Sequence, residues 1–256
     1  MKVTVLGCGP SSGVPMVGND WGACDPTNPR NRRRRVSILL AKGATRVLVD
    51  TSADLREQCL DAAIDSIDAV VYTHGHADHT HGIDDLRGFN HIRSGPLDVY
   101  GEPETLATIR ARFGYAFERL QYRGPWYRPS LVAKTINGAF RIGEIEIVPF
   151  AQGHGRVDTL GLRIGRFAYS TDVNQLTEAA FAALADLDVW IVDCARYQPN
   201  PGHAHLPLTL NWIERLAPRR AILTHMSSEF DYQTLANALP AGVEPAYDGM
   251  VIEVAD

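Results

Sequence analysis

The stretch that decides the fold is Thr73-His74-Gly75-His76-Ala77-Asp78-His79, which directly follows the strand-like run Ala69–Tyr72. Three imidazoles and a carboxylate at the end of a buried strand would carry a large desolvation cost unless something paired with them. His74 and His76 are two residues apart on an extended turn, so both can reach one divalent cation. Asp78 and His79 begin a helical turn and point to a neighbouring position. The stretch therefore predicts a metal site, with a solvated loop as the alternative interpretation.

Three residues further along the chain also follow strand-like runs. They are His154 after Ile145–Phe150, Asp172 after Phe167–Tyr169, and His225 after Ala221–Leu223. Each alone would be typical of a turn or a cap. Together they repeat one design, a polar residue where a buried strand meets solvent, and α/β proteins build their sites at such strand ends. We therefore expect these residues to complete the metal site.

Strand-like and helix-like stretches alternate along all 256 residues, without an internal repeat or a low-complexity linker. This pattern predicts a single α/β domain over residues 1–256, with two or more sheets covered by helices. Residues 36–49 and 145–169 each predict strand pairs joined by hairpin-length turns. The turn at Gly7 and Gly9 is followed by Ser12, so it lacks the GxGxxG spacing of a dinucleotide site. A simple Rossmann fold is therefore disfavoured. The predicted helices are Leu55–Ala63, Pro103–Phe113, Glu178–Leu187, Leu208–Leu216 and Tyr232–Leu239.

The composition narrows the classes of partner. Lysine and arginine contribute 25 residues against 30 of aspartate and glutamate, which leaves a formal net charge of −5. This balance disfavours a long nucleic acid as ligand, but not a small phosphorylated one. No run approaches the roughly 20 apolar residues that cross a bilayer, and the start lacks the pattern of a signal peptide. The four cysteines form no CxxC pair. We therefore expect a cytoplasmic protein with no membrane partner.

The HxHxDH box followed by His154, Asp172 and His225 resembles the metallo-β-lactamase superfamily. The resemblance implies an αββα sandwich of two mixed sheets flanked by helices, with the site at one edge of the sheets. It also implies two divalent ions, for which zinc suits the histidine-rich position and manganese or iron is also tolerated at the second. Asp50 resembles an aspartate that orients the metal-binding loop, although it could instead cap the helix that follows it. The implied ligands are His74, His76 and His154 for the first ion, Asp78, His79 and His225 for the second, and Asp172 as the bridge.

Further motifs resemble one branch of this superfamily, the phosphoribosyl cyclic phosphodiesterases of the carbon–phosphorus lyase pathway. These motifs are Gly13-Val14-Pro15, an arginine-rich stretch, Gly82–Arg87, and Leu223-Thr224-His225 followed by Phe230-Asp231. The branch implies hydrolysis of a small cyclic ribose or nucleotide phosphate to a monophosphate, for example phosphoribosyl 1,2-cyclic phosphate or a 2′,3′-cyclic nucleotide. It also implies a histidine that protonates the leaving alkoxide.

Two histidines compete for this role, and the His-x-x-Leu spacing favours His205 over His203. The candidate catalytic residues are then His205 and the metal ligand Asp78. The alternatives are a nuclease that trims RNA 3′ ends, a lactone or acyl hydrolase with the same metals, and a metal-binding sensor without activity.

Two segments remain open. Arg30 and the run Arg32–Arg35 form either a solvated turn or a phosphate clamp, with Arg33 and Arg35 as the candidates. The aromatic residues in 113–127 form either packed core or a dimer surface, so a homodimer stays open, or a lid in which Tyr122, Trp126 or Tyr127 stacks on a base. Of the branch's additional zinc site in the first long loop, only Cys24 is present, so we expect that site to be absent.

Overall fold

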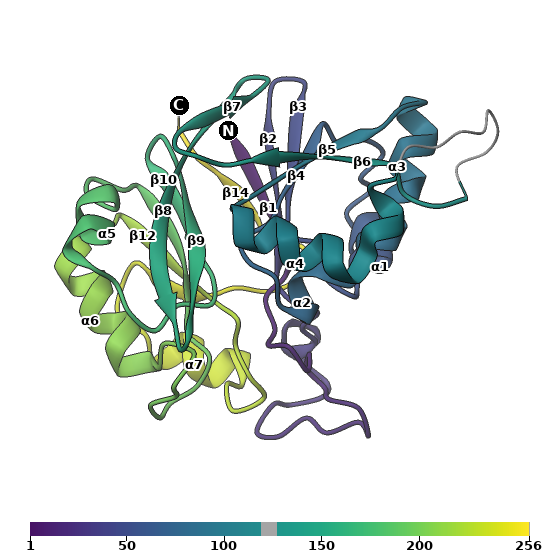
Figure 1. The fold of residues 1–256 in the computed structure, drawn as a ribbon. Helices are drawn as coiled ribbons and strands as arrows, with labels where there is room; N and C mark the ends of the chain where they lie inside the picture. Colours follow the sequence, from purple (N-terminus) through teal and green to yellow (C-terminus); the bar gives the residue numbers. More distant parts are fainter. Residues whose placement is uncertain (119–126, 256) are drawn as a thin grey trace.

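Two seven-stranded sheets face each other, and helices cover the outer face of each (Figure 1). The computed structural model describes residues 1–118 and 127–255. Both sheets are mixed, because each combines antiparallel and parallel neighbours. This arrangement confirms the αββα sandwich of mixed sheets that the sequence resemblance implies.

The first sheet contains most of the N-terminal half and the last strand. Its antiparallel part runs from β14 to β3, and its parallel part from β3 to β6. In sheet order its strands are β14 (Val251–Glu253), β1 (Lys2–Gly7), β2 (Ser37–Lys42), β3 (Thr45–Val49), β4 (Ala69–Val71), β5 (Leu97–Gly101) and β6 (Leu131–Thr135). Its helices are α1 (Leu55–Asp61), α2 (Ala77–Thr80), α3 (Leu86–Arg93) and α4 (Pro103–Phe113), with the 3-10 turns η1 (Pro29–Asn31), η2 (Ile83–Asp85) and η3 (Gly114–Ala116).

The second sheet mirrors this plan. Its strands from β13 to β10 are parallel, and those from β10 to β7 are antiparallel. In sheet order they are β13 (Val243–Pro245), β12 (Arg220–Thr224), β11 (Val189–Asp193), β10 (Phe167–Ser170), β9 (Val157–Ile164), β8 (Ile145–His154) and β7 (Phe140–Ile142). The helices on this side are α5 (Glu178–Ala183), α6 (Leu206–Leu216) and α7 (Tyr232–Ala238).

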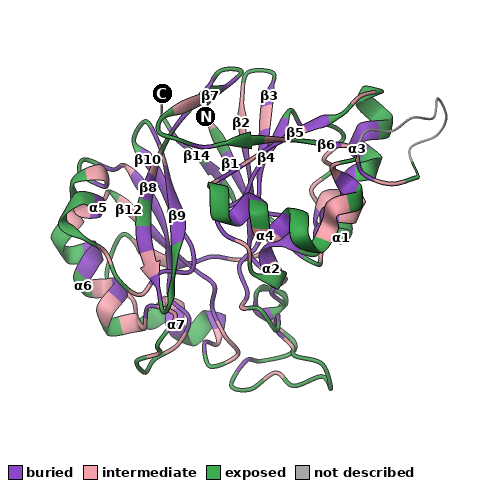
Figure 2. Cartoon of the chain, in the orientation of Figure 1, coloured by how far each residue is buried: buried purple, intermediate pink, exposed green. Residues whose placement is uncertain are grey.

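The strand sequences explain the packing. β11, with the sequence VWIVD, is buried along its whole length because the facing sheet covers one side and α5 to α7 the other. The nearby strands β9 and β10 are also mostly buried (Figure 2). β8, next to the edge strand β7, instead alternates buried and exposed residues over much of its length, as expected for a strand that is covered on one face. One core lies between the sheets and beneath α5 to α7, and a second lies between the first sheet and α1, α3 and α4.

Three strands end in an unusual backbone conformation. Asp50 after β3, Asp172 after β10 and His225 after β12 have φ angles of 63°, 51° and 60°. Positive φ is uncommon for residues other than glycine, and such strain clusters where the surrounding structure holds a functional side chain. All three turns lie at the same edge of the sandwich as the loop that follows β4.

The five predicted helices are all present, Pro103–Phe113 with the ends of α4 and the other four with one end shifted. The predicted helical turn at Asp78 and His79 is confirmed as α2. The sequence analysis missed α3, β6, β7 and β13. None of the described helices is long and apolar enough to span a membrane. Tyr122 and Trp126 lie outside the described residues. Tyr127 is 63% exposed, and Phe113 and Phe117 pack against the core beneath α4.

Candidate active site

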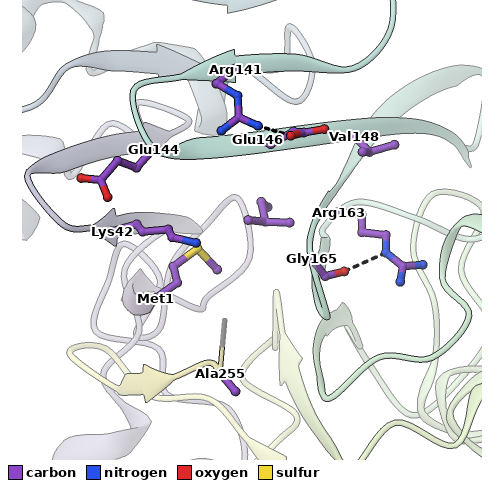
Figure 3. Close-up of a pocket in the computed structure, with 10 residues that line it drawn as sticks. Met1, Lys42, Arg141, Glu144, Glu146, Val148, Arg163, Gly165 and Ala255 are labelled. Atoms are coloured by element: carbon purple, nitrogen blue, oxygen red, sulfur yellow. Dashed lines mark hydrogen bonds and ion pairs between the residues drawn. The ribbon is translucent and has the colours of Figure 1, made fainter.

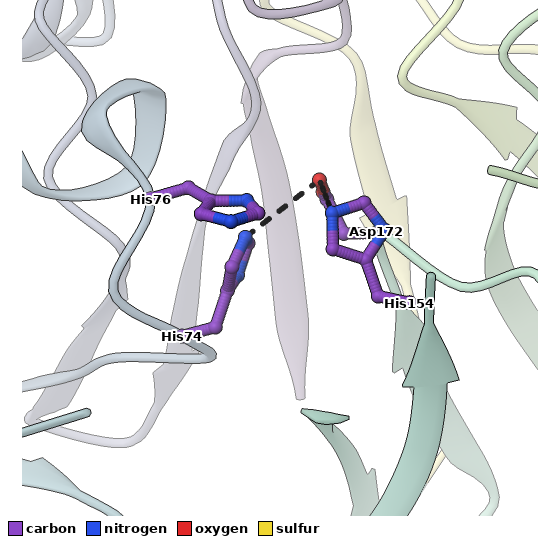
Figure 4. Close-up of side chains that lie close together, drawn as sticks. All are labelled: His74, His76, His154 and Asp172. Atoms are coloured by element: carbon purple, nitrogen blue, oxygen red, sulfur yellow. Dashed lines mark ion pairs between the residues drawn. The ribbon is translucent and has the colours of Figure 1, made fainter. Parts of the chain in front are cut away.

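The predicted ligands come together at one edge of the sandwich in two groups that share Asp172, of which Figure 4 shows the first. The first group is His74, His76, His154 and Asp172, and the second is Asp78, His79, Asp172 and His225. Within each group the potential ligand atoms all lie within 4.8 Å of one another. The first sheet supplies the residues that follow β4, and the second sheet supplies those that follow β8, β10 and β12.

The two oxygens of Asp172 face different groups. Oδ2 lies 3.8 Å from His74 Nε2 and 3.7 Å from His154 Nε2. Oδ1 lies 3.1 Å from His79 Nε2 and 3.5 Å from His225 Nε2. Ligands held at about 2.0–2.2 Å around a tetrahedral ion are themselves about 3.3 Å apart. The separations therefore suit one ion on each side of this carboxylate.

The buried ring nitrogens support the same interpretation. The Nε2 atoms of His74, His79 and His225 have no hydrogen-bond partner, although these side chains are at most 3% exposed. Leaving a buried polar atom unpaired costs about 1–3 kcal/mol each. A divalent cation in each group satisfies these atoms, so the donor set fits metal ions.

The electrostatics at Asp172 and His74 favour the charge states that bind metal, whereas the carboxylates around His79 and His225 raise the pKa of those two rings. Burial disfavours ionisation of Asp172, but the neighbouring His225 and His79 hold its pKa well below the usual range. Burial lowers the pKa of His74 well below its usual value, and His79 adds to the effect. A neutral imidazole and an ionised carboxylate are the forms that coordinate a cation.

Residues behind the ligands fix the orientation of the rings. Asp50 Oδ2 lies 2.7 Å from His79 Nδ1, and Thr73 donates to Asp50 from both its backbone N and its Oγ1 at 2.8 Å. The Nδ1 of His154 donates to the Gly202 carbonyl in the same way. Each contact leaves Nε2 directed at the cluster. Asp50 is therefore not the cap of α1, whose N-cap residue is Asp54.

Asp193 and His203 form a pair that the sequence analysis did not assemble. His203 Nδ1 lies 2.9 Å from Asp193 Oδ2 and 3.9 Å from Asp172 Oδ2. The ring of His203 stacks 4.4 Å from that of His225 and lies 4.7 Å from that of His154. Asp193 is fully buried, whereas the His203 side chain keeps 22% exposure. This pair therefore offers a partly accessible proton donor beside the ligands.

His205 has a different position. It is the N-cap residue of α6, and its Nδ1 accepts a hydrogen bond from the Leu208 backbone N at 3.0 Å. This nitrogen is therefore already used to cap the helix. Among the described residues, none of the groups that could hold a metal ion includes His205. The structure therefore favours His203 over His205, which corrects the preference drawn from the sequence.

The two arginines expected to clamp a phosphate are engaged elsewhere. Arg33 is 1% exposed, and its guanidinium donates to the carbonyls of Phe230 at 2.6 Å and Ser227 at 3.1 Å. Arg35 pairs with Asp54 at 2.9 Å and donates to the Ser11 carbonyl. The phosphate-clamp assignment is therefore corrected, because both side chains hold parts of this chain together.

Cys24 lies against the same structure as Arg33. Its Sγ is 3.7 Å from the guanidinium and 3.2 Å from the Phe230 carbonyl. Within residues 1–118 and 127–255, none of the groups that could hold a metal ion includes Cys24. The guanidinium thus fastens the first long loop to the segment that contains Ser227 and Phe230.

Two cavities contrast in their surroundings. One of about 370 Å³ lies at the opposite end of the sandwich, beside the β2–β3 hairpin (Figure 3). There Arg141 pairs with Glu146, and Arg163 donates to the Gly165 carbonyl. A second cavity of about 270 Å³ is lined by His74 and His76 and opens directly beside the cluster. Of these two cavities, only the second can hold a ligand in contact with His74 and His76.

A comparison with known families agrees with the fold and the paired clusters. The family model of the beta-lactamase superfamily domain matches residues 45–226, which include every predicted ligand. The chain belongs to this family. A diphosphatase of the PhnP family has a crystal structure that is 32% identical in sequence, with a TM-score of 0.91 over 99% of this chain and 98% of that one. This similarity confirms the resemblance to that branch of the superfamily.

Two curated relatives are also similar. An octanoyltransferase of Porphyromonas gingivalis is 33% identical over 254 residues, 98% of this chain but 51% of that protein. A ribonuclease Z of a Bradyrhizobium species is 31% identical over 85 residues, 32% of this chain and 28% of that protein. The chain thus spans about half the length of the octanoyltransferase and 28% of the ribonuclease Z. The activities of these relatives are those of longer proteins.

Proposed function

We propose that this protein is a dinuclear metal-dependent phosphodiesterase that hydrolyses a small cyclic ribose or nucleotide phosphate to a monophosphate. The observation that carries the proposal is the position of Asp172, whose two oxygens each face a separate set of histidine nitrogens. The similarity to a diphosphatase of the PhnP family over nearly the whole chain supports phosphorus chemistry in particular.

In this proposal, His74, His76 and His154 hold one ion, Asp78, His79 and His225 hold the other, and Asp172 bridges them. Zinc or manganese suits these nitrogen and oxygen ligands, and iron is also compatible. The ions supply Lewis acidity that neutralises phosphate charge and makes water nucleophilic at neutral pH. The chain's own part is to hold the ligands from both sheets in one geometry, and to keep each Nε2 directed inward through contacts such as the one between Asp50 and His79.

His203 is the proposed donor of a proton to the departing ribose oxygen. Asp193 accepts from its Nδ1, which fixes the tautomer and stabilises the protonated ring, so the second proton is carried on Nε2. A ribose alkoxide is a poor leaving group, so this proton transfer is expected to contribute about 10²–10⁴-fold to the rate.

Two alternatives have a specific observation behind them. The octanoyltransferase relative keeps acyl chemistry open, since the same metal ligands can serve ester or lactone hydrolysis. The ribonuclease Z relative keeps an RNA substrate open, but the net charge of −5 disfavours a long polyanion.

Phosphorus NMR with the metal-loaded protein tests the proposal. The panel contains a ribose 1,2-cyclic phosphate, 2′,3′-cyclic nucleotides, a linear dinucleotide and, in a parallel assay, a lactone. We expect one cyclic phosphate to open to a monophosphate. Turnover of the lactone alone, or of nothing while both metals are bound, would contradict the phosphodiesterase assignment.

The role of His203 is tested by His203→Ala with His205→Ala as the matched control. We expect His203→Ala to lose about 10²–10⁴-fold on a cyclic ribose ester and far less on a p-nitrophenyl phosphodiester, whose leaving group needs no proton. His205→Ala should cost about 1 kcal/mol of stability through the lost helix cap but keep its turnover rate. Equal losses on both esters would show that His203 does not act as the acid.

A further inference from the structure

The cavity beside His74 and His76 has a wall of distinct composition. One face of α4 lines it with Glu104, Thr108 and Arg112, which follow one another at intervals of four residues. Across from α4, the start of β9 contributes Asp158, next to the residue that pairs with His154 at the end of the β8–β9 hairpin. The wall therefore adjoins the ligands of one proposed ion.

The cavity is joined to the cluster through His74. This side chain is 3% exposed, lines the cavity, and has no hydrogen-bond partner at its Nε2. In Figure 4 the ring of His74 points toward Asp172, with His76 on one side of it. A substrate whose phosphorus lies at the cluster would therefore place a neighbouring group against α4 and β9.

The wall is acidic. Two carboxyl groups line it, those of Glu104 and Asp158. Burial raises the pKa of the neighbouring Glu102, and the charges of Asp158 and Glu104 raise it further. Arg112 is the one cationic side chain among the described residues that line the cavity. Its guanidinium donates to the Gly75 carbonyl, which fastens it to the loop that carries His74 and His76. Two carboxylates thus line the wall together with one guanidinium, which donates one of its hydrogen bonds to the Gly75 carbonyl.

We propose that this cavity takes the uncharged sugar or nucleoside part of the substrate, and that Glu104 and Asp158 select against a second phosphate group there. The inference rests on the proposed function, because it assumes that the reacting phosphodiester lies at the metal ligands. Ribose hydroxyls and the amino groups of bases are donors that suit carboxylate acceptors, whereas a second phosphate meets like charge.

The size of the cavity agrees with this assignment. Its volume of about 270 Å³ lies below the roughly 300–1,000 Å³ of pockets that enclose a whole drug-sized ligand. It suits one part of a nucleotide, with the reacting phosphate outside it at the cluster. The preferred substrate class is therefore a cyclic phosphate on an otherwise uncharged ribose or nucleoside, and not phosphoribosyl 1,2-cyclic phosphate, whose ribose carries a second phosphate.

The test compares adenosine 2′,3′-cyclic phosphate with the same compound carrying a 5′-phosphate. We expect the metal-loaded wild-type protein to favour the first compound about tenfold in kcat/KM, the size of repulsion from two partly solvated carboxylates. The double variant Glu104→Gln/Asp158→Asn should reduce this preference to about twofold or less, mainly through faster turnover of the 5′-phosphorylated compound. Glu178→Gln, on exposed α5, is the matched control and should keep the tenfold preference.

Product binding separates this inference from the proposed function. Calorimetry measures the affinities of adenosine 3′-phosphate and adenosine 3′,5′-bisphosphate, whether or not the protein turns over either substrate. A preference for the monophosphate that the double variant loses would support the acidic wall. Equal product affinities in the wild type, or a preference unchanged by the double substitution, would overturn it. Absence of turnover with this binding preference intact would count against the proposed function alone.

Discussion

Replacing Arg33 by methionine tests whether its guanidinium holds the first long loop against the segment that contains Ser227 and Phe230. The guanidinium donates to Phe230 O at 2.6 Å, Ser227 O at 3.1 Å and Asn31 Oδ1 at 3.3 Å. The two carbonyls belong to the segment that follows the proposed ligand His225. One buried side chain therefore fastens two segments that are distant in the sequence, close to the site.

The expected loss follows from these contacts. A hydrogen bond that involves a charged group contributes about 1.5–3 kcal/mol net, so the two bonds to carbonyls alone correspond to about 3–6 kcal/mol. Methionine retains much of the apolar stem, and relief from burying a charge offsets part of the loss. We expect Arg33→Met to lower the free energy of unfolding by about 3–4 kcal/mol. Arg34→Met is the matched control, because Arg34 pairs with Asp61 at the surface, where such pairs contribute about 0–1 kcal/mol.

Urea denaturation followed by circular dichroism measures both variants. A chelator is present throughout, because bound metal would add its own stabilisation to the folded state. Cys24 is 3% exposed and lies beside Arg33, so its labelling by a thiol reagent, located by mass spectrometry, reports on the loop itself. If Arg33→Met unfolds within about 1 kcal/mol of Arg34→Met and Cys24 stays protected, the guanidinium does not hold the loop and the reasoning fails.

Three further predictions concern carboxyl groups. Asp172→Ala should lose most of its bound metal by elemental analysis, and two tightly held ions in that variant would contradict the bridge. Asp50→Asn should weaken metal binding about 10–100-fold in competition with a chromogenic chelator, and unchanged affinity would show that Asp50 does not orient His79. Burial raises the pKa of Asp248 to about 6. The protein therefore loses unfolding free energy as the pH rises from about 4 to about 6, because the Asp248 carboxyl ionises more readily in the unfolded chain than in the folded one. Relative to the wild type, Asp248→Asn should therefore gain up to about 3 kcal/mol of unfolding free energy across that window, and a difference independent of pH would contradict this.

The clustering of the candidate ligands can be predicted from the sequence because their placement is mostly local. His74, His76, Asp78 and His79 lie on one turn after one strand, and the period of a strand and the start of a helix decide where they point. Asp172 and His225 could be added because each ends a strand-like run, and the carboxyl ends of parallel strands meet at one edge of a sheet. The short strands β6, β7 and β13 were missed because three to five residues give little periodicity to recognise.

The choice between His203 and His205 shows where spacing fails. His-x-x-Leu fits His203 with Leu206 as well as His205 with Leu208. Pro207 distinguishes the two, because proline is favoured in the first turn of a helix. It indicates that α6 begins at about Leu206, so that His205 is the capping residue just before the helix. Asp193 ends a wholly apolar run just as Asp50 does, and Asp50 was identified only through the family resemblance.

The roles of Arg33 and Arg35 depend on tertiary contacts that no local pattern contains. A run of arginines is ordinarily a solvated surface or a ligand clamp, and only the fold brings the carbonyls of residues 227 and 230 around Arg33. The positive φ angles of Asp50, Asp172 and His225 are equally invisible in the sequence.

Each of the two candidate metal groups that share Asp172 combines side chains from both sheets, so it forms only where the two sheets pack together. His74 and His76 of the first sheet meet His154 of the second, and Asp78 and His79 of the first meet His225 of the second. Each proposed ion therefore has ligands from both sheets, and Asp172 belongs to both sets. Without a cation, buried nitrogens from opposite sheets face one another unpaired. The polar edge that would otherwise weaken the sandwich thus becomes a contact between its halves when metal binds, because binding free energy adds directly to the stability of the folded state.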